Sequence, residues 1–467
     1  MPRYVKPTSI SLWVLARVAG ISSVILTAIF LGGCLSRTNA PPAPVISFTE
    51  LKNSIVQIRG LALKHDIRLD AVNAAGGPGT PDDVSIEAYG PSTVAQVARA
   101  YKRIGLLPEN TDFPSALADY RRLERMAYYD PGSANVSMAP QAWILGRAFS
   151  EKNPRIAGEV PAVFAIMQAL QAQHFHWHER IKSITLEDRR LTLRALAIGD
   201  ATLVALTRAS GGQTVVSSGT EAETLVRLAS AVEKSAANLP ELLRWKLVFP
   251  YRQGTQFVSW AHASRGWNGV NALFSNPPLS TSQILHPEKY YVQEENPLRI
   301  FPWGLTRRMK GKAVLEQTLG EYLIRLLLST VRSETAAAEI AAGWQGDLLS
   351  AYQEGGHTVT AWISSWKTDK EAGEFLRAYV GVLEKLHRFR FEAPAGQDGH
   401  LQADLSAGRF MLLQVKGPMV LLLDGMPLPQ AFETAQETWK DLETEKESTA
   451  MPFDLARATL QLDSIRR

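Results

Sequence analysis

Apolar residues recur every three or four positions through much of the N-terminal half of the chain, which is the spacing of amphipathic helices. This spacing predicts helices from Ile46 to about residue 65, at 91–105, at 114–126 and across 159–247, with a loop or short hairpin interrupting the last at 208–220. Alternation of apolar and polar residues predicts short strands at 66–72 and 135–140. A segment punctuated by Pro and Gly then runs to Tyr291.

The pattern changes after about Trp303. It predicts a helix at 313–333, a shorter helix, and a hairpin of two strands, 346–353 and 358–366, whose turn contains Gly355 and Gly356. A helix at 368–387, with Thr368 as its N-cap, and strands at 388–394, 409–417 and 419–427 complete the series. We therefore expect an α+β chain, with a mostly helical domain at 46–305, a smaller α+β domain with antiparallel strands at 312–446, and a peripheral tail at 447–467.

The N-terminus predicts a lipoprotein signal peptide. A basic segment ending at Arg17 precedes the apolar run 18–33, which is short for a membrane span and closes on Leu31-Gly32-Gly33-Cys34. This closing sequence resembles the lipobox of bacterial lipoproteins, so we expect a signal peptide at 1–33, acyl chains such as palmitate on Cys34, and a Pro-rich tether at 34–45. The alternative is an incidental cysteine in an ordinary signal peptide or an uncleaved anchor. Leu35 is not acidic, which favours the outer membrane, facing the periplasm.

The composition excludes few classes of function, and nucleic-acid binding is the one it argues against. Of 467 residues, 45% are hydrophobic and 21% charged, as in ordinary globular proteins. The formal net charge is +4, and Arg3, Lys6 and Arg17 of the predicted leader carry three of those charges. The remainder is close to neutral and has no basic run with interleaved aromatics, so we expect no nucleic-acid partner. Because Cys34 is the only cysteine, the mature chain cannot form an internal disulfide.

Several short motifs follow one another in the order found in a known family. In sequence they are GLLP at 105–108, YYDP at 128–131, ALQAQHF at 169–175, GDAT at 199–202, FPY at 249–251 with Gly254, STSQILHPEKY at 280–290, GWQGD at 343–347 and EF at 374–375. Together they resemble bacterial exported HExxH metallopeptidase-like proteins of the gluzincin type. That resemblance implies a zincin-like fold, in which two histidines one helical turn apart hold zinc and the glutamate polarises a bound water.

The resemblance also implies that the zinc site is degenerate. Aligned through ALQ at 169–171, the two histidine positions are Phe164 and Gln168, the catalytic glutamate position is Ala165, and the third ligand position is Ile198. Phe and Ile carry no lone pair for a metal, so we expect no catalytic residues and no cofactor. We expect Phe164 and Ile198 to pack as an apolar seam between two helices, and Asp200 to orient a helix.

Two other sets of side chains carry alternative interpretations. His174 and His178, spaced as on one helical face, could hold a displaced metal with Glu179; the simpler interpretation is that His176 and His178 face solvent at a helix end. Further along, Tyr251, Trp260, His262, Trp267 and His286 could line a former substrate groove, or they could be core residues; Glu288 and Asp200 could form an acidic pair.

The predicted function is that of a membrane-anchored envelope lipoprotein. In this interpretation the chain is a catalytically inactive metallopeptidase homologue that binds or scaffolds a peptide or an envelope partner. The alternative is an active metal-dependent hydrolase with displaced ligands around His174–Glu179, joined by His262 or His286, with zinc as its cofactor. A third possibility is a purely structural lipoprotein without a ligand groove.

Overall fold

The computed structural model describes residues 46–70, 91–150, 154–212, 220–309, 313–354, 357–394, 399–405 and 407–448. The predicted signal peptide, Cys34, its tether, the Gly355–Gly356 turn and the tail from residue 449 lie outside these residues. The described residues all belong to one unit that begins at Pro41, and the predicted domain boundary near residue 305 stays a prediction. Among the described helices, none has the length and apolar content needed to cross a bilayer.

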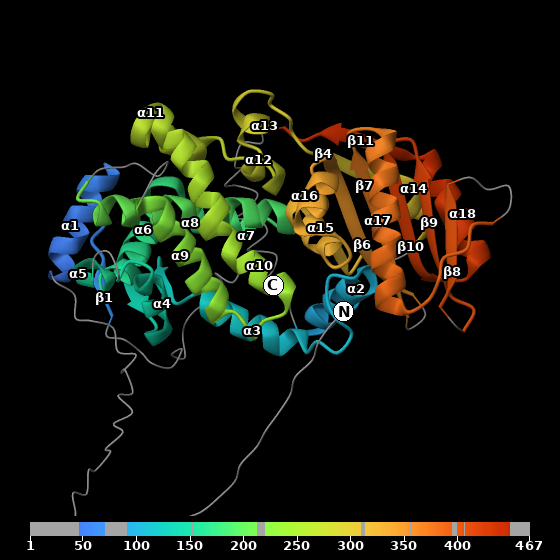
Figure 1. Cartoon of the computed structure of the whole chain (residues 1–467), viewed down its shortest axis with the longest axis horizontal. Coiled ribbons are helices and arrows are strands. Elements are labelled where there is room, and N and C mark those ends of the chain that lie inside the picture. The colour runs from blue at the N-terminus through green and yellow to red at the C-terminus, as the bar shows by residue number, and fades with distance from the viewer. Residues whose placement is uncertain are drawn as a thin grey trace, which may run out of the picture. The chain divides into compact units, whose positions relative to one another are not determined.

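The part of the chain up to Tyr291 is mostly helical, and much of it was predicted from the spacing of apolar residues (Figure 1). Its helices are α1 (Phe48–Arg59), α2 (Pro91–Ile104), α3 (Phe113–Glu124), η2 (Pro140–Ala142), α4 (Trp143–Arg147), α5 (Pro154–Ala157), α6 (Val160–Phe175), α7 (Trp177–Ser183), α8 (Glu187–Ala209), α9 (Thr220–Ser235), α10 (Glu241–Phe249), η3 (Pro250–Gly254), α11 (Thr255–Ser275), α12 (Thr281–Leu285) and α13 (Pro287–Tyr291). The element η3 is a single π-helical turn, and α11 is kinked at Arg265 and Gly266.

A small sheet lies against these helices. It contains β1 (Arg68–Leu69), β2 (Ala127–Asp130) and β3 (Asn135–Met138) in the order β1-β3-β2. Strand β3 pairs parallel to β1 and antiparallel to β2, so β2 is an edge strand. Helix α6 packs against β2, β3, α1, α4 and α8, which places it at the centre of the helical part.

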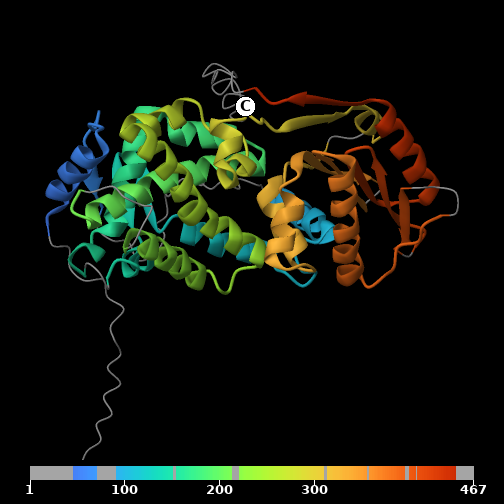
Figure 2. The ribbon, with the colours of Figure 1, turned by 45° about the horizontal axis from the view of Figure 1, so that its top comes forward.

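The rest of the chain builds a six-stranded antiparallel sheet in the order β5-β6-β7-β10-β9-β8. Its elements are β4 (Leu298–Pro302), α14 (Trp303–Arg308), β5 (Leu315–Gln317), α15 (Gly320–Ser329), α16 (Glu334–Ala341), β6 (Trp344–Glu354), β7 (His357–Trp366), α17 (Asp369–His387), β8 (His400–Asp404), β9 (Phe410–Lys416), β10 (Met419–Met426), α18 (Leu428–Lys440) and β11 (Leu442–Lys446). Strands β4 and β11 pair with each other as a separate antiparallel ribbon (Figure 2).

Helices cover both faces of the six-stranded sheet because neighbouring residues of a strand point to opposite sides. On β7, Trp362 belongs to the hydrophobic cluster that contains Phe375 of α17. The next residue, Ile363, belongs to the cluster that contains Ala431 and Ala435 of α18. The sheet is therefore buried on both faces, with α17 on one side and α14 and α18 on the other (Figure 1).

The predicted α+β class with antiparallel strands is confirmed, and some individual elements differ. The predicted helix at 313–333 is wrong in its first part, because Leu315–Gln317 pairs with β6 as β5. The predicted strand at 388–394 is wrong as well: only Glu392 forms an isolated bridge, to Gln402. The N-cap role of Thr368 is confirmed, since its side chain accepts a hydrogen bond from the backbone N–H of Glu371.

Candidate functional site

Helix α6 is buried on almost every side. From Val160 to Gln171 every residue except Gln168 is buried, and none of these side chains is ionisable. Pro161 stands in the first turn, where a missing N–H costs nothing, and the helix ends at His176, which is in the left-handed conformation with φ 52°. A helix that is apolar all round belongs to a core, which agrees with the position of α6.

Helices α6 and α8 pack side by side and antiparallel. Near one end, Arg208 Nη2 donates to Glu159 Oε2 at 2.9 Å. Towards the other end, Gln171 Nε2 donates to the backbone oxygen of Ala197 at 2.9 Å and to Asp200 Oδ2 at 3.1 Å. Ile198 follows Ala197 directly in α8.

Three of the four predicted degenerate positions carry hydrocarbon that packs in the core. Phe164 is buried, with its ring centroid 5.9 Å from that of Tyr251, and Ala165 is fully buried. Ile198 is partly buried and packs against the same hydrophobic cluster. Burial of the Phe164 side chain stabilises the fold by about 1.5–3 kcal/mol.

The fourth position, Gln168, is used as a hydrogen-bonding group for the edge strand β2. Its Nε2 donates to the backbone oxygen of Ala127 at 2.8 Å, and its Oε1 accepts from the backbone N–H of Tyr129 at 3.3 Å. The backbone C=O and N–H groups of residues two apart on a strand point to the same edge of that strand. The carboxamide of Gln168 therefore occupies the place that the backbone of an added strand would take.

The histidines near the C-terminal end of α6 do not lie on one helical face. His174 belongs to α6 and His178 to α7, and His176 separates the two helices. His174 Nε2 lies 2.6 Å from the backbone oxygen of Ala62, whereas the ring of His178 makes edge contacts with Tyr128 and Tyr129.

Of the two histidines predicted to face solvent, His176 is exposed, whereas His178 is only partly exposed. Burial lowers its pKa from 6.5 to about 4. Its Nδ1 atom is buried without a hydrogen-bond partner, so the ring is neutral at pH 7.

The residues at the ligand positions that the resemblance implies do not fit zinc. Phe164, Ala165 and Ile198 offer no lone pair, and both polar atoms of Gln168 are engaged with β2. Within the described ranges, no group of three or more His, Cys, Asp or Glu side chains is placed to hold a metal ion.

Asp200 forms a buried ion pair that fixes α1. Arg59 Nε donates to Asp200 Oδ1 at 2.8 Å, and both side chains are fully buried. Burial raises the pKa of Asp200, against the opposing effects of Arg59 and of the hydrogen bond from Gln171. The Arg59 guanidinium also lies 4.9 Å from the ring centroid of Trp267. Asp200, which we predicted to orient a helix, thus pairs with Arg59 of α1, a contact that was not predicted from the sequence.

A second buried charge cluster lies on the N-terminal half of α8. Lys246 Nζ is 2.8 Å from Glu187 Oε1, and Arg194 Nη1 is 2.6 Å from Glu124 Oε1. Burial lowers the pKa of Lys246 from 10.5 to about 7 and raises that of Glu187. Arg194 also donates to the hydroxyl of Tyr120 at 2.5 Å. These contacts join α3, α8 and α10 in the interior.

The residues predicted to line a substrate groove lie in separate environments. Tyr251 is buried against Phe164, Trp260 is 63% exposed, and His262 contacts Trp267 at a centroid distance of 4.5 Å. His286 Nε2 lies 2.6 Å from Glu321 Oε1. Glu288 lies 3.7 Å from His286.

The motif at 280–290 is a structural joint. Asp188 of α8 accepts hydrogen bonds from the backbone and hydroxyl of Thr281, while Glu321 accepts from Ser282 Oγ at 2.7 Å and from Lys289 Nζ at 3.4 Å. Gly320 is required at this joint, since a Cβ there would lie 1.8 Å from Asp188 Oδ1 and its φ is +72°.

The motif GWQGD has a similar structural use. Asp347 accepts four hydrogen bonds, from the backbone N–H of Leu319 and Gly320 and from the indoles of Trp344 and Trp362, at 2.9–3.0 Å. The carboxylate therefore ties β6 to the beginning of α15.

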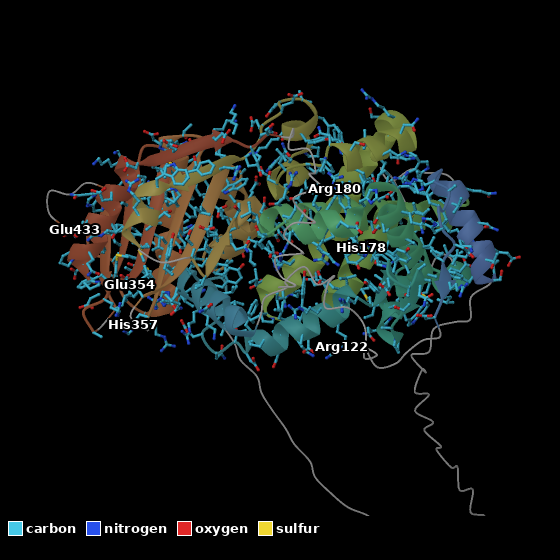
Figure 3. The ribbon with its side chains drawn as sticks, turned by 180° about the vertical axis from the view of Figure 1, so that it is seen from behind. Arg122, His178, Arg180, Glu354, His357 and Glu433 are labelled. Atoms are coloured by element: carbon cyan, nitrogen blue, oxygen red, sulfur yellow. The ribbon has the colours of Figure 1, made fainter. Side chains whose placement is uncertain are left out.

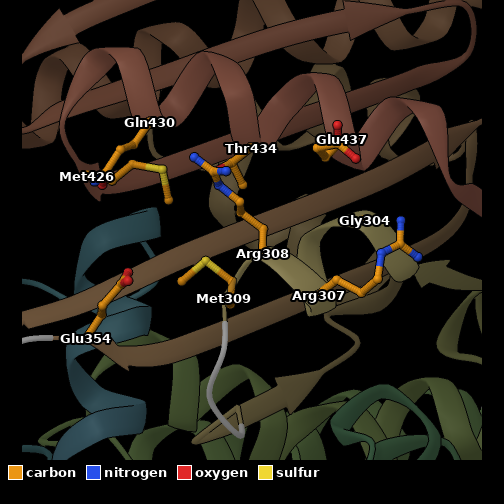
Figure 4. Close-up of a pocket in the computed structure, with 9 residues that line it drawn as sticks. All are labelled: Gly304, Arg307, Arg308, Met309, Glu354, Met426, Gln430, Thr434 and Glu437. Atoms are coloured by element: carbon orange, nitrogen blue, oxygen red, sulfur yellow. The ribbon is translucent and has the colours of Figure 1, made fainter.

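Three of the cavities that open on the surface of the described residues have volumes of about 400 Å³ or more. Two of them, of about 1030 Å³ and 400 Å³, share lining residues and so adjoin each other along the β4–β11 ribbon; together they are called the groove below. The shared residues are Thr185, Leu186, Arg189, Leu279, Arg299 and Glu447. The third, of about 430 Å³, lies between α14 and α18 and contains Arg308, which pairs with Glu433, and Arg307, which pairs with Asp441 (Figure 4).

The groove along β4 was not among the predicted sites. The sequence signal was nevertheless present, because Arg299, Phe301 and Trp303 alternate with Leu298, Ile300 and Pro302, as on a half-buried strand. No strand was predicted at β4, and its partner β11 lies about 140 residues later, at the end of the predicted 312–446 domain.

Comparison with known proteins finds a family similarity in the C-terminal part of the chain. A sequence-family profile described as a domain of unknown function (DUF8575) matches residues 307–435, a span that includes all six strands of the large sheet. No curated protein matches the chain, and no solved structure matches it.

Proposed function

We propose that this chain is a lipid-anchored binding protein of the bacterial cell envelope whose zincin-like helical frame carries no metal chemistry. The frame is the antiparallel pair α6 and α8 beside the edge strand β2. In the resembled family, zinc binds between such elements. In this chain the aligned positions carry the hydrocarbon side chains of Phe164, Ala165 and Ile198 and the carboxamide of Gln168.

The observation that carries the proposal is the double hydrogen bond of Gln168. A histidine at this position would direct its imidazole nitrogen to a metal, whereas Gln168 directs both polar atoms to the backbone of Ala127 and Tyr129. The edge of β2 is thereby already bonded at these residues, so an extended peptide cannot pair there. We therefore place ligand binding elsewhere on the molecule.

The anchor belongs to the same proposal and rests on Leu31-Gly32-Gly33-Cys34. Acyl chains on Cys34 would hold the protein at the outer membrane, facing the periplasm. Labelled palmitate should enter the wild-type protein and not Cys34→Ser, which should also leave the membrane fraction on cell lysis.

Metal content and peptidase activity test the loss of catalysis. Protein purified without chelators should contain far less than one zinc per chain by plasma mass spectrometry, and it should not cleave casein or a peptide library. Stoichiometric zinc, together with activity lost in His178→Ala and kept in the exposed control His357→Ala, would instead establish the displaced-ligand hydrolase (Figure 3).

A further inference from the structure

We propose that the groove along the β4–β11 ribbon binds a saccharide, with Trp303 as the platform on which a sugar ring stacks. The inference rests on the proposed binding role of the protein but on none of Phe164, Ala165, Gln168 and Ile198. Zinc measurements and sugar-binding measurements can therefore fail independently of each other.

The first argument is the presentation of Trp303. Its side chain lines the groove and is 46% exposed, which is unusual for so large an apolar ring. Phe301 packs against it with ring centroids 5.6 Å apart and planes inclined by only 12°. Behind Phe301, the Arg299 guanidinium lies 5.0 Å from the phenyl centroid. The three planar groups support one another, so the indole is held in place while much of its surface stays open.

The second argument is a fixed orientation of the indole. Trp303 Nε1 donates to Glu443 Oε2 at 3.0 Å, and Glu443 lies opposite Phe301 in the register of β4 with β11. A rigid aromatic surface loses little conformational entropy when a ligand stacks on it. The electron-rich face of an indole attracts the partly positive C–H groups that line one side of a pyranose ring.

The third argument is the mixture of charges around the groove. Among the lining side chains that are at least partly exposed, four are basic and three are acidic, so neither sign dominates; they are Arg180, Arg189, Arg299, Lys446, Glu316, Glu445 and Glu447. A polyanion or a polycation would meet repulsion along part of the groove. A neutral ligand rich in hydroxyl groups fits this lining, since carboxylates accept its hydrogen bonds and guanidinium groups donate to it.

Individual side chains supply both kinds of hydrogen bond. Glu447 lies near Arg189 and Arg299, and burial raises its pKa. Arg189 is held by its bond to the backbone oxygen of Pro278 at 2.8 Å. The volumes of about 400 Å³ and 1030 Å³ are in the range of small-ligand sites.

Titration of the full-length lipoprotein in detergent micelles with chitohexaose, cellohexaose and maltohexaose tests the inference. Calorimetry and tryptophan fluorescence should detect binding of at least one of them. Trp303→Ala should weaken that binding about tenfold or more. Trp303→Tyr, which keeps a ring, should lose less affinity. Trp260→Ala removes another exposed indole, on α11, and should bind as the wild type does.

Three results would overturn the inference. The first is that none of the three oligosaccharides binds. The second is that the wild type and a folded Trp303→Ala bind equally well. The third is that Trp260→Ala loses as much affinity as Trp303→Ala does. Circular dichroism and the thermal midpoint show whether each variant is folded. Should Trp303→Ala fail to fold, the comparison of Trp303→Tyr with Trp260→Ala decides the matter.

Discussion

Single side chains in this protein are placed where their protonation affects stability. His178 is the clearest case, because its pKa falls to about 4 in the folded chain and is near 6.5 when the chain is unfolded. Between these values the unfolded state binds more protons than the folded state. The free energy of unfolding therefore falls as the pH drops from about 6.5 to about 4, and is regained as the pH rises.

Replacement of His178 by phenylalanine should remove this dependence. The phenyl ring keeps the edge contacts with Tyr128 and Tyr129 but cannot be protonated. The free energy of unfolding, measured with urea, should change between pH 7 and pH 4.5 by roughly 2 kcal/mol less in His178→Phe than in the wild type. The control is His357→Phe at the exposed start of β7, which should keep the wild-type difference. An unchanged difference in His178→Phe would mean that His178 is not buried as described.

The Arg59–Asp200 ion pair permits a second test at this scale. Removing one partner leaves a buried charge uncompensated, so Asp200→Ala should cost about 3–5 kcal/mol of unfolding free energy. The double variant Arg59→Met with Asp200→Leu should cost less than Asp200→Ala alone. Arg122→Ala is the matched control, because the Arg122–Asp119 pair is exposed and contributes about 1 kcal/mol or less. A small cost for Asp200→Ala would show that α1 is not fixed by this pair.

At the scale of elements, the packing of α6 on α8 allows the metal position that the resemblance implies to be built by substitution. The variant Phe164→His, Ala165→Glu, Gln168→His and Ile198→Glu restores the family's donors on two adjacent helices. We expect it to bind zinc, measured by calorimetric titration, and to unfold at lower urea concentration because polar groups enter a core. The control with only Phe164→His and Ala165→Glu should bind zinc much more weakly. No zinc binding by the full variant would show that the helices are displaced from the family arrangement.

Much of the helical architecture could be predicted from the sequence, because amphipathic spacing is a local signal. Helices α2, α3 and α17 were predicted to within about two residues of their observed ends. Strands β4 and β11 were missed because their pairing joins segments far apart in the chain. Strand β5 was assigned to a helix because its three residues carry too little pattern to show an alternation.

The candidate sites were harder to predict for the same physical reason. The alignment with the resembled family and their apolar chemistry predicted that Phe164 and Ile198 pack in the core; Phe164 is buried and Ile198 is partly buried. The partner of Gln168 could not be predicted, because it is the backbone of Ala127 and Tyr129, which a sequence pattern does not identify. Likewise, His176 ends α6 by adopting a left-handed conformation that residues other than glycine adopt uncommonly, so His174 and His178 lie on two different helices.

At the scale of the whole molecule, buried carboxylates join the helical part to the six-stranded sheet. Asp188 on α8 contacts Thr281 and Gly320, and Asp347 on β6 holds the N-terminus of α15. Near α17, Arg103 of α2 pairs with Asp424 of β10 through two hydrogen bonds, at 2.7 and 2.5 Å. Motifs that resemble a peptidase family thus have structural uses that need no metal.

Gly320→Ala tests this joint. The added methyl group would collide with Asp188, and alanine is strained at φ +72°, so we expect a loss of about 2–4 kcal/mol in urea unfolding. Gly408→Ala is a matched control with a similar φ of +69° and no atom within 4 Å of the new methyl group. It should lose about 1 kcal/mol, from backbone strain alone. Equal losses in the two variants would show that the contact with Asp188 contributes nothing.

The central claim is that hydrocarbon and the Gln168 carboxamide occupy the position where the resembled family binds zinc. Calorimetric unfolding of the wild-type protein in excess zinc and in excess chelator tests this claim most directly, since a metal that binds only the folded state raises the unfolding temperature. We predict the same midpoint under both conditions. A midpoint that rises with zinc concentration and falls in chelator would contradict the account.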